Sequence, residues 1–227
     1  MSGVPRVRRV STLASMSTIG PVSGHAPVER TALADLLESI GPDRPTLCTG
    51  WTTRDLAAHL VVRAYRPDAG AGIVVRQLAG HTRKVQNRAA TRDWPALVAQ
   101  VRRLPWWWAP VDESLNLTEY FVHHEDIRRA QPGWEPRELD RDLSAKLWGR
   151  VRALAKLALR RTPATVTVSA PGYGSVTAGR GGEAAVTLKG APQELLLFLM
   201  GRQDHAIVDL SGPQQITERM RHARYGI

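Results

Sequence analysis

The chain has 227 residues, a length that suits one large domain or two small ones with a substantial core. Hydrophobic residues make up 43% and charged residues 23%, which excludes a disordered or collagen-like chain. The net charge of +10 leaves an acidic partner open, but the charges are scattered, so an arginine-rich surface is the favoured interpretation. No apolar run is long enough to span a bilayer, and we expect a soluble, cytoplasmic protein.

The first half of the chain is predicted to be helical after a disordered leader. Residues 1–25 contain Ser, Gly, Pro and Arg without hydrophobic periodicity, which is typical of disorder. Apolar residues then recur at helical spacings, and Gly-Pro and Arg-Pro pairs separate the segments. The expected helices cover about 27–40, 52–66, 73–104 with a break near Trp94-Pro95, and 114–130. Short and medium loops between them favour an antiparallel four-helix bundle over residues 26–135.

Residues 136–227 have a different pattern, typical of a small α/β domain. Asp140 is expected to cap a helix that ends near Arg161 and packs on the bundle. Alternating apolar residues bounded by Gly-rich turns predict strands, and two further stretches predict helices. The expected strands cover 165–170, 175–178, 185–188 and 205–210, and the further helices cover 191–202 and 213–224. The predicted fold class is therefore α+β.

The fourth predicted helix carries polar residues on the face that should point into the bundle. Glu119 and His123 are one turn apart, as two ligands of one metal ion must be. Asp126 falls on the same stripe, and a hydrogen bond to a ligand is its expected use. Burying such groups without partners is costly, whereas a metal ion satisfies them.

A third metal ligand is expected from the second helix. His59 lies there in the otherwise apolar run 56–60, and a core histidine by itself is more often a packing residue than a ligand. Together with Glu119 and His123 it completes a set of two imidazoles and one carboxylate. That set suits Zn²⁺ or Fe²⁺ and leaves an open coordination position, which is typical of a catalytic metal site.

Other residues near these motifs carry weaker signals. His124 should point about 100° away from His123 and is placed outside the metal site. Glu125 is expected to form a surface ion pair with Arg129 at i+4. Cys48, the single cysteine, is favoured as a small buried hydrophobe, with a reactive thiol as the alternative. The tryptophans at 106–108 are expected to plug the mouth of the bundle, with stacking on a ligand as the alternative.

Two motifs carry a resemblance to a known family: GWTTRDLAAHL at 50–60, and Glu119-x-x-x-His123-x-x-Asp126. Together they resemble the mycothiol-dependent maleylpyruvate isomerase family of actinobacteria. That family consists of DinB-like metal-binding four-helix bundles with a small α/β C-terminal domain. The string PTLCTGW at 45–51 is most similar to a metal-binding subgroup of the family rather than to the isomerase itself.

The resemblance also implies site residues and a reaction. By position, the family's metal ligands fall on His59, Glu119 and His123, and its acid after the second histidine falls on Asp126. Arg202, which ends an apolar helix, is implied to face the active site, where it would hold a substrate carboxylate. The alternative is that its positive charge only stabilises the C-terminal end of that helix. The implied activity is a metal-dependent isomerase or transferase with mycothiol as co-substrate.

In that activity the metal would lower the pKa of the thiol, and the thiolate would attack a small electrophilic substrate. Asp126 would orient a metal-bound histidine or handle a proton. Two other classes stay open: a non-catalytic metal- or ligand-binding module and, less favoured, a basic nucleic-acid-associated protein. We expect small-molecule partners, no membrane partner, and a monomer or homodimer.

Overall fold

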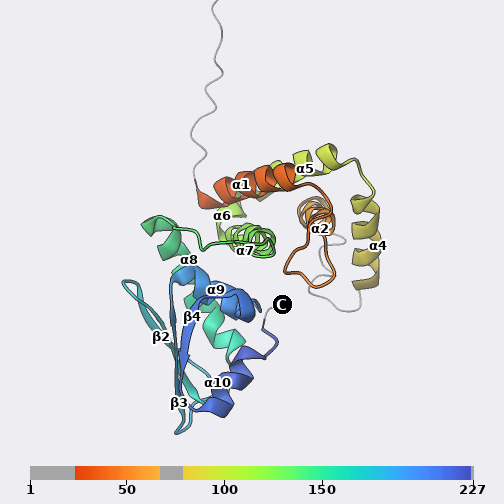
Figure 1. Ribbon diagram of the computed structural model, residues 1–227. Coiled ribbons are helices and arrows are strands. Elements are labelled where there is room, and N and C mark those ends of the chain that lie inside the picture. The colour runs from red at the N-terminus through yellow and green to blue at the C-terminus, as the bar shows by residue number, and fades with distance from the viewer. Residues whose placement is uncertain (1–23, 67–78, 226–227) are drawn as a thin grey trace, which may run out of the picture.

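The computed structural model describes residues 24–66 and 79–225, so the predicted leader lies almost wholly outside the described residues. Within these ranges the protein is a mixed α+β structure with nine α-helices and a four-stranded mixed sheet (Figure 1). The predicted α+β class is confirmed for this part of the chain. None of the described helices is long and apolar enough to cross a membrane.

The N-terminal part of the protein is helical. Its helices are α1 (His25–Ile40), α2 (Thr53–Tyr65), α4 (Ala79–Ala90), α5 (Trp94–Arg102), α6 (Asp112–Leu115) and α7 (Leu117–Arg128). Helix α1 lies against α7 and α5, and α2 packs against α4 and α5 (Figure 1). Leu33 of α1, Leu56 of α2 and Phe121 of α7 are buried in the core that these helices share.

The predicted break near Trp94-Pro95 is confirmed: the third stretch forms α4 and α5, because Asp93 accepts a hydrogen bond from the backbone N–H of Ala96 and Pro95 occupies the first turn of α5. Residues 73–78 of that stretch lie outside the described residues. The fourth is interrupted at Asn116, between α6 and α7. A helical region is therefore shown, whereas its assignment as a DinB-like four-helix bundle stays a prediction.

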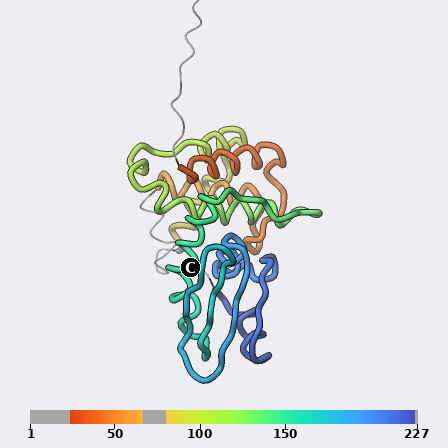
Figure 2. Tube along the Cα trace, turned by 90° about the vertical axis from the view of Figure 1, so that its left-hand side faces the viewer, coloured from red at the N-terminus to blue at the C-terminus, as the bar shows by residue number. Residues whose placement is uncertain are grey.

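Residues 141–221 form the α/β part of the protein. Its elements are α8 (Arg141–Ala158), β1 (Thr165–Ala170), β2 (Gly174–Ala178), β3 (Ala185–Gly190), α9 (Pro192–Leu199), β4 (Val208–Ser211) and α10 (Gln214–Arg221). The strand order is β2-β1-β3-β4; β1 and β3 are parallel, and both edge strands are antiparallel to their neighbours. Turned by 90°, the protein presents these strands lengthwise in its lower half (Figure 2).

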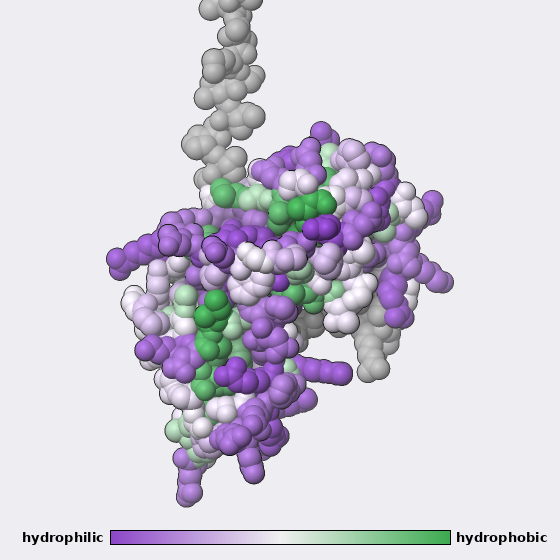
Figure 3. Space-filling view, in the orientation of Figure 1, coloured by the Kyte–Doolittle hydropathy of each residue, from purple (hydrophilic) through white to green (hydrophobic). Residues whose placement is uncertain are grey.

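The sheet is covered by helices on one face. Along β1, Val166, Val168 and Ala170 are buried while the residues between them are partly exposed, which is the alternation of a strand with one apolar face. Helix α9 contacts β1, β3 and β4, and α8 contacts β2. The space-filling view shows hydrophilic residues spread over both parts of the visible face and not gathered into one stripe (Figure 3).

The predicted strand 205–210 begins later than expected, at Val208. Residues Gln203–His205 form a turn of 3-10 helix, and the backbone groups that follow are bound by buried side chains. Arg129 donates a hydrogen bond to the carbonyl of His205, and the N–H of Ile207 donates to Glu194 Oε2 at 2.8 Å. These backbone groups therefore do not pair with a neighbouring strand.

The prediction that the three tryptophans plug the bundle is wrong for two of them. Trp106 is 82% exposed and Trp107 is 50% exposed, whereas Trp108 donates a hydrogen bond from Nε1 to the carbonyl of Ala64 at 3.0 Å. Residues Trp106–Val111 form a 3-10 helix, in which successive side chains are turned by about 120°. Three consecutive side chains consequently point in three directions and do not share one buried face.

Candidate metal centre

Three side chains from two helices converge in the helical part. His59 lies in α2, and Glu119 and His123 lie one turn apart in α7. The Oε1 atom of Glu119 is 3.2 Å from His59 Nε2 and 3.3 Å from His123 Nε2. One nitrogen or oxygen atom of each residue lies within 4.8 Å of the others, close enough to hold a single ion. The structure thus brings together all three residues predicted as metal ligands.

The start and the register of α2 place His59 at this point. The helix begins with a capping box in which the N–H of Thr52 donates to Asp55 Oδ2 at 2.9 Å. The next turn buries His59 beside the Trp51 ring, 5.2 Å away between centroids. Arg63, one turn later, places its Nε 3.3 Å from Glu119 Oε1.

Burial and hydrogen bonds prepare two of these residues to bind a cation. Burial lowers the pKa of His59, which favours the neutral imidazole that metals require. Burial by itself would raise the pKa of Glu119, but hydrogen bonds with His123 and His59 outweigh it and hold that pKa well below its usual value. Glu119 is therefore an ionised carboxylate at neutral pH.

His123 is flanked by a carboxylate at each ring nitrogen. Nε2 faces Glu119, and Nδ1 is 2.9 Å from Asp126 Oδ2. Burial opposes the charged form, but the hydrogen bond to Asp126 and further polar contacts raise the pKa of His123 well above its usual value. A metal ion on Nε2 would take the place of one proton while Nδ1–H continues to donate to Asp126, the arrangement typical of metal-bound histidines. The donor set thus fits a divalent metal.

Asp126 and Arg202 form an ion pair directly behind His123. Asp126 has no exposed surface, and it accepts hydrogen bonds from Arg202 Nε at 2.8 Å and from the adjacent guanidinium nitrogen at 2.6 Å. Burial alone would raise the pKa of Asp126, but hydrogen bonds from His123 and Arg202 hold it far below its usual value. Both predicted residues therefore reach the site, and the guanidinium fork of Arg202 faces Asp126.

Cys48 completes this cluster from the loop before α2. Its Sγ donates to Asp126 Oδ2 at 3.3 Å and lies 4.0 Å from His123 Nδ1. Cys48, His123 and Asp126 form a second group whose ligand atoms lie within 4.8 Å of one another. The positively charged guanidinium group of Arg202 binds the same carboxylate and lies 3.8 Å from the sulfur, so it would repel a cation held there. This group therefore suits a metal ion less well than His59, Glu119 and His123 do.

A buried ion-pair network lies on the other side of α7, and the sequence interpretation missed it. His124 points there, as expected, with Nδ1 3.0 Å from Glu29 Oε2. Glu125 does pair with Arg129, at 2.6 Å, but both side chains are 1% exposed, so the predicted surface pair is wrong. The cause is that Arg129 also binds Glu194, 65 positions away, and that Arg137, which binds Glu125 as well, also binds Glu29, 108 positions away. The network comprises Glu29, His124, Glu125, Arg128, Arg129, Arg137 and Glu194.

This network joins the helical part to the α/β part. Arg129, at the end of α7, donates two hydrogen bonds to the carboxylate of Glu194 in α9, at 2.7 and 2.8 Å. Arg137 donates to Glu29 of α1 and to Glu125 of α7. Because Arg202 follows α9 by three residues, the Arg129–Glu194 pair fixes the segment that delivers Arg202 to Asp126. The only sequence signal for it was the i, i+4 spacing of Glu125 and Arg129.

No protein-family model, curated protein or solved structure matches this chain. The chemical interpretation of the centre consequently rests on the geometry of the chain's own residues.

Proposed function

We propose that this protein is a metal-dependent enzyme that uses a low-molecular-weight thiol of the mycothiol type as co-substrate. The reaction would be an isomerisation or a thiol transfer on a small, electrophilic, carboxylate-bearing substrate. The observation that carries the proposal is the convergence of His59, Glu119 and His123, whose ligand atoms lie within 4.8 Å of one another. The motifs in which these residues occur resemble the mycothiol-dependent maleylpyruvate isomerase family.

The chemistry of the donor set supports a catalytic rather than a structural metal. Two imidazoles and one carboxylate suit Zn²⁺ or Fe²⁺, and they supply three of the four ligands of a tetrahedral site. A divalent metal held there would lower the pKa of a thiol at the remaining position, so that the reactive thiolate exists at neutral pH.

The residues behind the ligands have distinct tasks in this proposal. Asp126 accepts a hydrogen bond from Nδ1–H of His123, which leaves Nε2 as the ligand atom and fixes the orientation of the ring. Arg202 acts as a positioning residue, because its fork holds Asp126 through two hydrogen bonds. To contact a substrate carboxylate directly, the guanidinium group of Arg202 would have to bind it beside Asp126 or release Asp126 first.

Metal content tests the first half of the proposal. The variants His123→Gln and His124→Gln are a matched pair, because they make the same substitution at neighbouring positions whose side chains point in different directions. We expect one metal ion per chain in the parent protein and in His124→Gln, and little metal in His123→Gln. Equal metal content in the two variants would contradict the assignment of the ligands.

A cobalt-substituted protein tests the thiol. The background is Cys48→Ser, so that the chain's own sulfur cannot produce the signal. Adding a small thiol such as 2-mercaptoethanol should generate a new sulfur-to-cobalt charge-transfer band. An unchanged spectrum at saturating thiol, with cobalt fully bound, would favour the non-catalytic binding module instead.

A further inference from the structure

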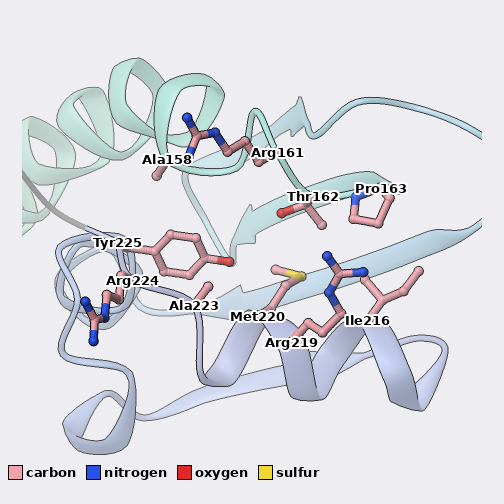
Figure 4. Close-up of a pocket in the computed structure, with 10 residues that line it drawn as sticks. All are labelled: Ala158, Arg161, Thr162, Pro163, Ile216, Arg219, Met220, Ala223, Arg224 and Tyr225. Carbon is pink, nitrogen blue, oxygen red and sulfur yellow. The ribbon is translucent and has the colours of Figure 1, made fainter.

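The α/β part contains a cleft that is separate from the metal centre. It lies between the C-terminal end of α8 and helix α10, and its volume is about 290 Å³ (Figure 4). A second hollow of about 310 Å³ adjoins it, and the two share Ala158, Arg161, Arg224 and Tyr225. The metal centre lies elsewhere: neither hollow is lined by His59, Glu119 or His123, or by the Asp126–Arg202 pair.

The charge of this cleft is entirely positive. Arg161, Arg219 and Arg224 line the first hollow, and Arg160 and two of the same residues line the second. No carboxylate of the described residues lines either one. Arg161 and Arg219 make no ion pair and no side-chain hydrogen bond with any of the described residues. They differ in this from the paired arginines of the buried network. Several like charges around one concavity attract an anion.

A buried hydroxyl group lies in the same cleft. The Oη atom of Tyr225 is shielded from solvent, and no described residue meets it in good hydrogen-bond geometry, although the Thr162 side chain lies close enough to act on its pKa. Figure 4 shows that this hydroxyl points into the space between α8 and α10, toward Thr162, while Arg219 extends from α10 on the facing side. Burial raises the pKa of Tyr225, and the nearby Thr162 side chain opposes this only in part. The hydroxyl thus stays protonated, and a buried donor without an acceptor is costly unless a ligand supplies one.

The floor of the cleft is apolar. Ile216 and Met220 of α10 face Pro163 and Ala158 across the first hollow (Figure 4), and the second hollow is lined in part by Leu199. Apolar walls with a few polar groups at fixed positions are typical of small-molecule sites. An extended nucleic acid instead requires a charged track with exposed stacking residues.

We propose that this cleft binds a small organic anion, with a phosphate-type oxyanion held by Arg161, Arg219 and the Tyr225 hydroxyl, and an apolar body resting on α10. The guanidinium groups supply the charge and two-pronged hydrogen bonds that phosphate oxygens accept. The Tyr225 hydroxyl supplies a neutral donor at the buried end. This site is independent of the metal centre and of the activity proposed for it.

Calorimetric titration with phenyl phosphate tests the proposal, because this probe combines a phosphate with an apolar ring. The full chain is used, with any affinity tag at the N-terminus, because Tyr225 of the cleft is only two residues from the end of the sequence. We expect phenyl phosphate to bind at least about tenfold more tightly than neutral benzyl alcohol, the worth of one charge-assisted hydrogen bond. Phenyl phosphate that does not bind at millimolar concentration, or binds no better than benzyl alcohol, would overturn the proposal.

Three variants locate the binding. Arg219→Gln should lower the affinity for phenyl phosphate about tenfold, and Tyr225→Phe should lower it several-fold while it keeps the ring packing. Arg221→Gln is the control, since Arg221 lies in the same helix and lines neither hollow. We expect this control to bind as the parent does. Equal losses in Arg219→Gln and Arg221→Gln would show general attraction to a basic surface and would overturn the proposed site.

Discussion

Replacing Asp126 by Asn removes one negative charge from the buried cluster and leaves the shape of the side chain nearly unchanged. Asp126 accepts hydrogen bonds from His123 Nδ1 and from two nitrogen atoms of Arg202. An amide has one oxygen in place of two, so its NH₂ group must face one of these donors. At least one charge-assisted hydrogen bond is lost, and the Arg202 charge loses its buried counter-ion.

The size of the effect follows from these contacts. A hydrogen bond to a charged group contributes about 1.5–3 kcal/mol, and removal of one partner of a buried ion pair costs about 3–5 kcal/mol. The side chain of Arg202 is 19% exposed, so water compensates part of its charge. We therefore expect Asp126→Asn to lower the free energy of unfolding by about 3 kcal/mol. Since Asp126 also orients His123, metal affinity should fall about 10–100-fold.

Urea denaturation of the metal-free protein measures the stability change, and a competitive chelator titration measures the affinity. With a denaturant slope of about 2 kcal/mol/M, the midpoint should shift by about 1.5 M. Asp142→Asn is the control, because Asp142 pairs with His25 and Lys146 but is well exposed, so we expect little change. If Asp126→Asn moved the midpoint no more than this control, the reasoning about the buried pair would be refuted.

Two further predictions concern the buried network that joins the two parts of the protein. Arg129→Met should lower the free energy of unfolding by about 3–5 kcal/mol in the same denaturation assay, because buried Glu194 loses its cation partner and buried Glu125 loses one of three. Adding Glu194→Gln should restore part of the loss, and an unchanged midpoint in the single variant would contradict the network's role. Burial by itself would raise the pKa of Glu29, but hydrogen bonds from His124 and Arg137 outweigh it and lower the pKa overall. The stabilisation that Glu29 contributes is therefore present above its unfolded pKa of about 4.3 and is lost as the pH falls through the folded pKa. Denaturation midpoints measured between pH 6 and pH 3 should decline at the acidic end, and Glu29→Gln should make that decline shallower; an identical slope in both proteins would exclude Glu29 as its source.

Much of the local structure was predictable because it depends on neighbouring residues. The capping box at Thr52, the cap at Asp140 and the start of α5 near Pro95 arise from side chains within a few positions of the backbone groups that they bind. The strands β1 and β3 follow from short alternating apolar segments between Gly-rich turns. Such signals lie entirely within one stretch of sequence.

The residues of the candidate metal centre were predictable for a related reason. The spacing of Glu119 and His123 places both on one face of a helix, whatever that helix packs against. His59 needed the Glu119–His123 pair as well, because a histidine in an apolar run is by itself more often a packing residue than a ligand. The structure places His59 Nε2 3.2 Å from Glu119 Oε1 across two helices, so the three residues could hold one ion.

The sequence alone determined the helices, most of the strands and the polar face of α7, because these depend on periodicity and on short-range capping. Only the tertiary structure decided which charges are buried. Glu125 was expected at the surface, but Arg129 and Arg137 bind it in the core. Arg202 was expected to hold a substrate carboxylate or to complete a helix terminus, but its guanidinium group binds Asp126. Arg202 and Asp126 are 76 positions apart, and the carboxylates that Arg129 and Arg137 also bind, Glu194 and Glu29, lie 65 and 108 positions from them. Such distant pairs leave no periodic trace in the sequence, since their meeting depends on how whole helices and the α/β part pack together.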